Sequence, residues 1–339
     1  AQHGPPLAEH APSSTEVCAL TFSTHDHPQV RDMLGHKVSR ERIGTELDGM
    51  IKGPDPLMAL DLLRSMRLFE AVFEVHPSAA GGDVPAAFAA AGSELGKSAC
   101  EALSAWGDVF QGDGLASGLD LAGQDVRRQT ILGALLLPLR HARVPFGKSK
   151  TQSMASHVVR DSLKWKSKDA DTIDLMHEVA PELVDAHAAL REGRDDARLR
   201  IKLGRCVKRL RQMWPSGVIL SCMLCREEAM PIGIEEAVEE EISWDAAQGS
   251  GDREMCKALV SAVHRFGVQD CWQWKPLLNG KEVMAALDIK GGPVLGAAMD
   301  ACFDYQLVNP GAARDIVLEW LKAKFEAGAI QDGSYANDL

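Results

Sequence analysis

The sequence predicts an all-α protein. Aromatic residues make up only 5% of its 339 residues, while Ala, Leu and Met are plentiful, and this balance favours helix over sheet. Alternating runs of Val, Ile, Thr and Tyr, which are typical of strands, are missing, and so are repeats at a fixed period. The length is sufficient for two or three domains with hydrophobic cores. No apolar run approaches the roughly 20 residues that are needed to cross a bilayer.

Residues 1–25 are predicted to form a flexible leader, because they contain three prolines but no apolar signal core. His25 and His27 flank Asp26 at its end. In a polar leader such residues are usually solvent-exposed, so no metal site is predicted there.

Residues 26–125 are predicted to contain helices and an Ala/Gly-rich insert. In the first helix Arg42 and Glu46 stand four residues apart and can pair on one face. Asp55 is a suitable N-cap for the next helix, and Pro56 suits its first position. The apolar face of that helix is expected to enter the core through Leu62, Leu63, Met66 and Phe69.

The region from Ser78 to Gly123 is predicted to be a flexible insert or loop. It is rich in Ala and Gly, and it is punctuated by Gly81-Gly82, Gly112-Asp113-Gly114 and Gly118. The helical pattern resumes at about residue 126.

Residues 126–254 are predicted to form a helical body that ends in an acidic linker. The chain has a net charge of −11, yet residues 140–168 carry eight Lys or Arg against one acid, and residues 191–211 carry nine against three. Residues 227–254 carry ten acids and one Arg. Clustered Lys and Arg bind RNA phosphates, so both basic segments are candidate RNA contacts. The alternative is two solvated helix faces, joined by an acidic connector that faces solvent or a protein partner.

Residues 255–339 are predicted to form a helical tail with a frayed end. A short helix that starts near Leu277 is followed by a Gly-Pro turn, a second helix, and a stop at Asn309-Pro310. Gly292 permits close backbone approach and Lys290 lies beside exposed amides, a combination that can hold a phosphate. The alternative is a plain loop between two surface helices.

Three segments resemble motifs of the CCA-adding enzymes, the tRNA nucleotidyltransferases. Leu277–Pro310 is similar to their tail, where a Gly-Lys-Asp/Glu helix, a Pro-Gly-Pro turn and a Gln-Leu-x-Asn-Pro stop follow in order; here Gly291 replaces the first Pro of the turn. Val38–Pro54 resembles the Arg-Glu-Arg-Ile-Gly-x-Glu-Leu neck motif of the eukaryotic and bacterial class. His157–Lys166 resembles the Arg-Glu/Asp-Ser-Leu-Lys segment of their body domain. The resemblance covers roughly residues 30 to 75 and 127 to 325.

The resemblance implies an irregular helical array of neck, body and tail that recognises the shape of a tRNA through its phosphates and 2′-hydroxyls. The neck motif consists of Arg40, Glu41, Arg42 and Glu46. The RNA-binding residues that we expect are Lys148, Lys150, Arg160, Lys164, Lys166, Lys281, Lys290 and Gly292. Trp165 is a candidate for stacking on a base, with burial in the core as the alternative.

In this family, catalysis belongs to a head with a nucleotidyltransferase sheet, which uses Mg²⁺, CTP and ATP and needs paired carboxylates to hold two metal ions. Asp169-Ala170-Asp171 spells the metal motif, but no strand or Gly-Ser turn precedes it, so we expect a solvated helix start. Arg127-Arg128-Gln129 lacks the Asp of an Arg-Arg-Asp motif. Gly147-Lys148-Ser149 lacks the first Gly of a phosphate loop. No catalytic residue, metal ligand or cofactor is therefore assigned to this chain.

The chain is accordingly expected to be a neck, body and tail without a catalytic sheet domain, inactive alone, with tRNA as its partner. A separate catalytic head or other protein subunits are further expected partners. One alternative is a headless, non-catalytic relative that serves as a structural subunit of a large organellar assembly. Another is a fragment of a working enzyme.

The eight cysteines are not expected to form a disulfide framework. Cys222-Met223-Leu224-Cys225 lies in an apolar run, which favours buried free thiols over a redox or zinc site. Free thiols indicate a reducing compartment, which means a mitochondrial or other organelle matrix, the cytoplasm or the nucleus, and argue against secretion.

Overall fold

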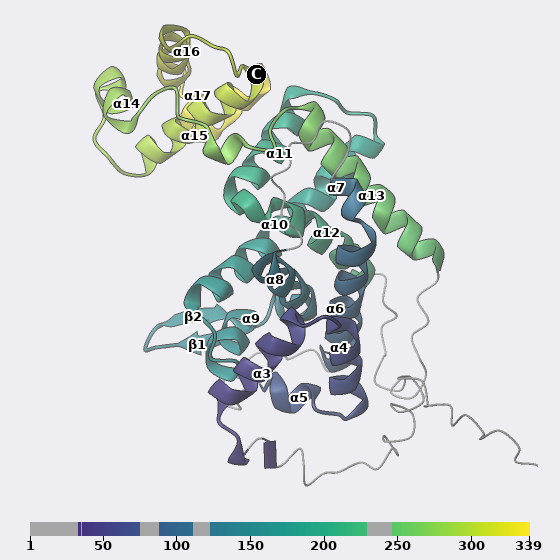
Figure 1. The fold of residues 1–339 in the computed structure, drawn as a ribbon. Helices are drawn as coiled ribbons and strands as arrows, with labels where there is room; N and C mark the ends of the chain where they lie inside the picture. The colour runs from purple at the N-terminus through teal and green to yellow at the C-terminus, as the bar shows by residue number, and fades with distance from the viewer. Residues whose placement is uncertain (1–32, 35, 75–87, 111–122, 229–245) are drawn as a thin grey trace, which may run out of the picture.

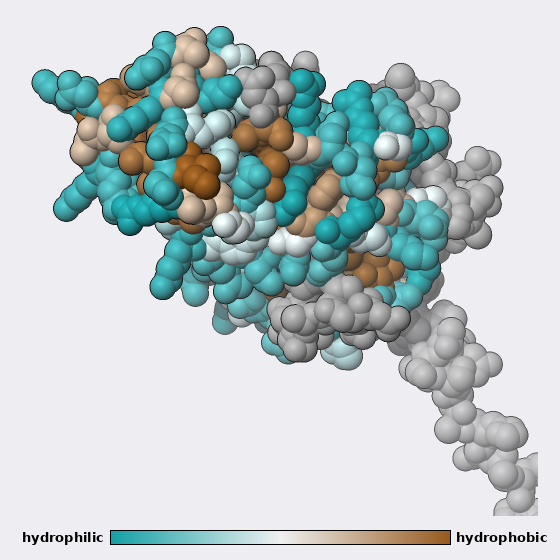
Figure 2. Space-filling model, turned by 90° about the horizontal axis from the view of Figure 1, so that it is seen from above, coloured by the Kyte–Doolittle hydropathy of each residue, from teal (hydrophilic) through white to brown (hydrophobic). Residues whose placement is uncertain are grey.

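The computed structural model describes residues 33–34, 36–74, 88–110, 123–228 and 246–339, and it confirms the all-α prediction (Figure 1). The predicted leader lies outside the described residues. The helices up to α13 stack into a column, and the last four helices form a smaller group at one end of it. Figure 2 shows that hydrophilic residues cover most of the face seen from above, with hydrophobic residues in separate groups.

The column contains eleven α-helices among the described residues, together with short helical turns. Its helices are α3 (Arg40–Lys52), α4 (Pro56–Ser65), α5 (Phe69–Val72), α6 (Phe88–Ala105), α7 (Gly107–Phe110), α8 (Gln124–Leu135), α9 (Met154–His157), α10 (Ser167–Arg191), α11 (Ala197–Leu210), α12 (Trp214–Glu228) and α13 (Ala246–Arg265). A π-helical turn, η3 (Val158–Ser162), follows α9 directly. The smaller group consists of α14 (Gly280–Leu287), α15 (Pro293–Val308), α16 (Arg314–Glu326) and α17 (Ala329–Asp332).

The division of the core differs from the boundary at residue 255 that the sequence suggests. Met255, Leu259 and Val263 of α13 are buried in the same hydrophobic cluster as α3 to α12. A second cluster begins at Leu278 and contains most of the buried apolar residues of α14 to α17, while Leu307 of α15 belongs to the first cluster. The helix expected to open the tail therefore packs on the body, because its apolar face is complementary to α12.

Helix α6 contradicts the prediction of a flexible insert for residues 88–110. It packs against α4, α8 and α12 in the middle of the column. Small residues make this packing possible: a Cβ on Gly92 would lie 2.5 Å from the carbonyl oxygen of Leu135, and one on Gly96 would lie 3.1 Å from Leu60. The abundance of Ala and Gly reflects close helix contacts rather than a loop. The rest of the Ser78–Gly123 region, residues 78–87 and 111–122, lies outside the described residues.

A β-hairpin interrupts the body that the sequence predicts to be wholly helical. Strands β1 (Arg143–Phe146) and β2 (Lys150–Ser153) pair antiparallel, with Arg143 opposite Ser153 and Phe146 opposite Lys150. Each strand has four residues, which is too short for an alternating pattern to be recognised in the sequence. Gly147 turns the chain at a φ of +67°.

Helix α4 begins as predicted, since Asp55 accepts a hydrogen bond from the amide of Met58 at 2.9 Å and Pro56 is the first helical residue. Its predicted apolar face is partly wrong. Leu63 and Phe69 are buried and Leu62 is half-buried, but the side chain of Met66 is exposed because the helix ends at Ser65.

Two of the motif segments meet at one tight junction. The Arg40 guanidinium of α3 donates hydrogen bonds to the carbonyl oxygens of Ser162, at 2.7 Å, and Ala71, at 2.8 Å. Trp165 donates from its indole nitrogen to the carbonyl oxygen of Gly44 at 2.9 Å. A Cβ on Gly44 would lie 1.8 Å from the carbonyl oxygen of Leu163, so no other residue fits there without moving the backbone. The neck motif thus holds the body segment that follows η3.

We expect Gly44→Ala to destabilise the protein by about 3 kcal/mol or more, because the added methyl group meets backbone rather than a flexible side chain. Gly49→Ala is the matched control in the same helix, where a Cβ meets nothing within 4 Å. The control should be neutral or stabilising by up to about 1 kcal/mol, since Ala is the better helix former. Chemical denaturation of both variants measures the difference, and equal stabilities would contradict the packing described here.

Candidate functional site

The first basic segment presents exposed lysines, one of which, Lys164, has the exposed Glu41 as an acidic neighbour. Lys148 and Lys150 lie on the hairpin, and Lys164 and Lys166 lie between η3 and α10. All four side chains are exposed, and none of them forms an ion pair with a carboxylate within the part of the chain that the structure describes. Lys164 has a φ of +54°, which a non-glycine residue adopts only where its neighbours hold it. The segment is therefore an exposed cationic surface.

Arg160 differs from these lysines because its guanidinium is already engaged. It donates to Asp171 at 2.6 Å and to the side-chain oxygen of Gln152 at 3.1 Å. The residue is only half-exposed, so its primary structural role is to connect η3 with β2 and α10.

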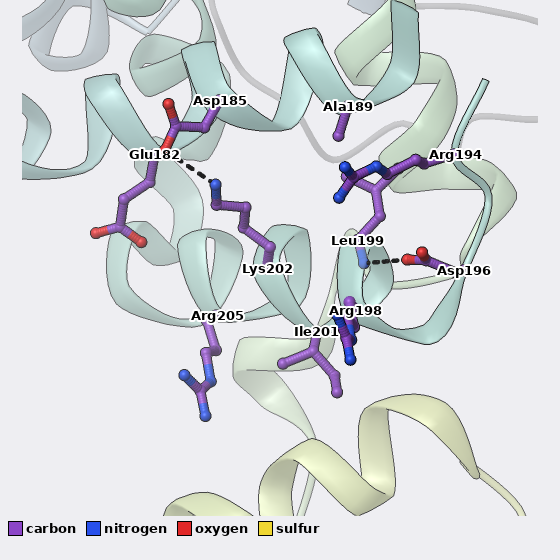
Figure 3. Close-up of a pocket in the computed structure, with 10 residues that line it drawn as sticks. All are labelled: Glu182, Asp185, Ala189, Arg194, Asp196, Arg198, Leu199, Ile201, Lys202 and Arg205. Carbon is purple, nitrogen blue, oxygen red and sulfur yellow. Dashed lines mark hydrogen bonds and ion pairs between the residues drawn. The ribbon is translucent and has the colours of Figure 1, made fainter. Parts of the chain in front are cut away.

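The second basic segment, residues 191–211, is largely neutralised by internal ion pairs. Arg194 pairs with Glu192, Lys202 with Asp185, Arg205 with Asp304, Lys208 with Asp300, and Arg209 with Glu178 and Glu182. A cleft of about 410 Å³ lies between the end of α10 and α11, and Figure 3 shows that acidic and basic side chains share its wall. Lys202 points to Asp185 there, and the Asp196 carboxylate accepts the amide of Leu199 as an N-cap. This mixture of charges makes the cleft a weaker anion site than the first basic segment.

The Asp169-Ala170-Asp171 motif is not a solvated helix start, as the sequence suggests. Asp169 is buried, and its carboxylate accepts hydrogen bonds from Arg128 at 2.6 Å and from Gln129 at 2.9 Å. Arg128 is itself only 8% exposed, so it requires a carboxylate partner inside the fold. Asp171 lies on the outside and pairs with Arg160. Both carboxylates serve structural ion pairs and face different neighbours.

Trp165 is used by the fold in a way that competes with stacking on a base. Its indole nitrogen is bonded to Gly44, and the guanidinium of Arg128 lies 4.6 Å from the centre of its ring. The ring thus takes part in the junction between α3 and α10, as the core alternative expects.

Gly147-Lys148-Ser149 forms the turn of the hairpin, which is not the strand-to-helix turn of a phosphate loop.

The neck motif has one inward and three outward residues. Arg40 points into the fold, while Glu41, Arg42 and Glu46 are exposed. The ion pairs among the described residues include no contact between Arg42 and Glu46, so the predicted pairing is not formed.

The tail turn has the predicted order of a helix, a turn and a second helix. Asn279 and Glu282 form a capping box at the start of α14, which engages the amide of Lys281 at 3.0 Å. Gly292 has a φ of +118°, a backbone conformation that is essentially restricted to glycine. No side chain caps α15, so the amides that follow Gly292 and the exposed Lys290 remain available to an anion.

An ion pair with a buried carboxylate attaches this tail to the body. The carboxylate of Asp304 on α15 accepts a hydrogen bond from Nε of Arg205 on α11 at 2.8 Å and from the hydroxyl of Tyr335 at 2.8 Å. Burial, with the contact to Asp304, raises the pKa of Tyr335, and the hydrogen bond that Arg205 donates to Asp304 raises the pKa of Arg205. Tyr335 is buried, so the end of the chain is packed, and the prediction of a frayed end is wrong.

The cysteines that the structure describes are free thiols, in agreement with the sequence. Cys222 is buried, and burial raises its pKa well above the ordinary value. Cys225 is half-buried, and burial raises its pKa as well. Neither thiol is poised to be a nucleophile at neutral pH.

Comparisons with known proteins point to one group of enzymes, although no family model and no solved structure matches the chain. The chain is 24% identical over 299 residues to tRNA nucleotidyltransferase cca2 of Schizosaccharomyces pombe, and 21% identical over 303 residues to cca1 of the same yeast. It is 20% identical over 322 residues to the mitochondrial CCA tRNA nucleotidyltransferase of Saccharomyces cerevisiae.

These matches include 86%, 85% and 87% of this chain but only 53%, 53% and 54% of the relatives, so the chain spans about half of their length. Among the described helices, none combines the length and the apolar character of a membrane-crossing segment. Over most of its length, the chain is similar to CCA tRNA nucleotidyltransferases.

Proposed function

We propose that this chain is the neck, body and tail part of a CCA-adding tRNA nucleotidyltransferase and that it binds tRNA. The observation that carries the proposal is the contrast between the two basic segments. The fold pairs five of the nine cations in residues 191–211 with carboxylates but, among the described residues, forms no ion pair with Lys148, Lys150, Lys164 or Lys166, which are exposed. Unpaired cations on fixed supports are what a phosphate backbone requires. The similarity to tRNA nucleotidyltransferases supports tRNA as the polyanion.

Two separate elements are available for a long ligand. The hairpin and the tail both reach out to the same side of the helical column in Figure 1. Lys148 and Lys150 lie on the hairpin, Lys281 lies at the start of α14, and Lys290 lies in the turn before α15. The Arg205–Asp304 pair fixes the tail on the body, so the spacing of the two elements is set by the fold. An elongated RNA helix suits this arrangement better than a compact ligand.

Charge reversal tests the hairpin. We expect Lys148→Glu and Lys150→Glu to raise the Kd for tRNA about uniformly across tRNA sequences, and to reduce the slope of log K against log salt by about one per lost contact. Lys257→Glu is the matched control, because Lys257 is an exposed lysine on α13, away from the hairpin in Figure 1. Fluorescence anisotropy at several salt concentrations measures both quantities. Salt-independent binding, or no binding at low salt, would refute the proposal and favour a structural subunit that has lost RNA binding.

The tail turn is tested by two substitutions with different expected effects. Lys290→Glu should weaken tRNA binding and change stability by less than about 0.5 kcal/mol, because the side chain is exposed. Gly292→Val should reduce stability by about 1–3 kcal/mol, because Val avoids a φ of +118°, and should weaken binding as well. Gly291→Ala is the control, since its φ is ordinary and a Cβ there meets nothing within 4 Å. If both variants bind tRNA as tightly as the wild type, the turn is structural only.

Catalysis by the chain alone is tested with CTP, ATP, Mg²⁺ and a tRNA that lacks its terminal CCA. We expect no nucleotide incorporation, because Asp169 is bound to Arg128 and Asp171 to Arg160 instead of forming a metal-binding pair. Asp171→Asn is the informative variant, since Asp171 is exposed and its replacement should preserve the fold. The expectation would be overturned if the wild type extended the tRNA and the folded Asp171→Asn variant did not.

A further inference from the structure

The hairpin carries an exposed aromatic ring, and phosphate binding by its lysines does not account for that ring. Phe146 is the last residue of β1 and is 48% exposed. Among the phenylalanines that the structure describes, Phe146 alone is exposed, while the others are buried in or packed against the two hydrophobic clusters. The ring therefore adds little to the hydrophobic core, and its exposure to water does not stabilise the fold.

The base of the hairpin is firmly held although its tip is exposed. Val144 is only 1% exposed, and the amide of Met154 donates to the carbonyl oxygen of Ala142 at 2.9 Å. Ser153 donates to Asp174 at 2.5 Å, and Gln152 accepts from Arg160. Successive residues of a strand alternate between two faces, so Val144 and Phe146 share one face. The buried Val144 side chain thus sets the direction of the Phe146 ring.

The surroundings of the ring are cationic. Lys150 lies directly opposite Phe146 in the strand pair, Lys148 lies in the turn, and Arg143 is exposed at the start of β1. Four acids near the hairpin base are engaged: Asp174 accepts the hydroxyls of Ser153 and Ser156, Asp171 pairs with Arg160, Asp161 with His157, and Glu178 with Arg209. A single aromatic ring among unpaired cations is too small an apolar area for a protein interface. It has the composition of a surface that stacks one base and binds the flanking phosphates.

We propose that the β1–β2 hairpin is an RNA-binding finger in which Phe146 stacks on an unpaired base while Lys148 and Lys150 contact the adjacent phosphates. This inference rests on the proposed binding of tRNA. Stacking needs a base whose face is free, so the finger contacts a single-stranded part of the tRNA, at its 3′ end or in a loop. The aromatic side chain has few rotatable bonds and a fixed support, so it loses little entropy on binding.

The test compares Phe146→Ala with Phe146→Trp. We expect Phe146→Ala to raise the Kd for tRNA by about 5- to 100-fold, and Phe146→Trp to bind as tightly as the wild type. The salt slope should stay unchanged, because no charge is removed. Met58→Ala is the matched control, since Met58 is 50% exposed on α4, away from the hairpin.

Two RNA probes make the result specific. Binding to a fully base-paired RNA duplex should be the same for wild type and Phe146→Ala, and a tRNA without its unpaired 3′ nucleotides shows whether the stacked base lies at that end or in a loop. If the wild type binds tRNA and Phe146→Ala binds it equally well, the proposal that Phe146 stacks on a base is overturned, while the proposal that the chain binds tRNA is not. If Phe146→Ala loses as much affinity for the base-paired duplex as for tRNA, stacking on an unpaired base is overturned as well. No tRNA binding by the wild type would overturn both proposals.

Discussion

The contact between Gly44 and the carbonyl oxygen of Leu163 is the constraint on which the proposed RNA surface depends. Because no side chain separates α3 from this carbonyl, the chain after η3 lies directly on the helix. Arg40 and Trp165 add hydrogen bonds on either side of the contact. The backbone has a positive φ at Lys164, and Trp165 then packs against α3 while Lys164 and Lys166 remain exposed. The two lysines at 164 and 166 are thus exposed as a consequence of packing.

Local pairing of charges, rather than their number, separates the two basic segments. Residues 191–211 contain more cations than residues 140–168, yet most of them meet carboxylates on α10, α15 or their own loop. An exposed ion pair contributes at most about 1 kcal/mol, so these pairs matter little for stability. They matter for binding, because a phosphate must compete with a carboxylate that is already present. The net charge of −11 does not reveal this difference.

The sequence predicted the class of the fold and the places of the motif helices, because those features depend on local signals. Asp55 and Pro56 begin α4, and Asn279 begins α14, through contacts within four residues. What could not be predicted depends on residues far apart in the chain. Ala and Gly in α6 resemble a linker until Leu60 and Leu135 are placed against them, and Asp169 looks solvated until Arg128 is found 41 residues away.

In the candidate RNA-binding site, too, local features were predicted and features that depend on distant residues were not. The basic residues were recognised as a group from the sequence, but Phe146 was missed, since a single aromatic residue has no pattern and its exposure follows from the hairpin. The tail motif was recognised, yet its attachment to the body depends on Asp304 and Tyr335, which lie outside the Gly-Pro turn. Asp304 is almost completely buried, so removal of Arg205 leaves a buried carboxylate without its charged partner and destabilises the attachment. The position of Lys290 relative to the hairpin therefore depends on the Arg205–Asp304 pair, which lies outside the proposed RNA-binding residues: a proposed surface for a long ligand requires its two ends to be joined by the core.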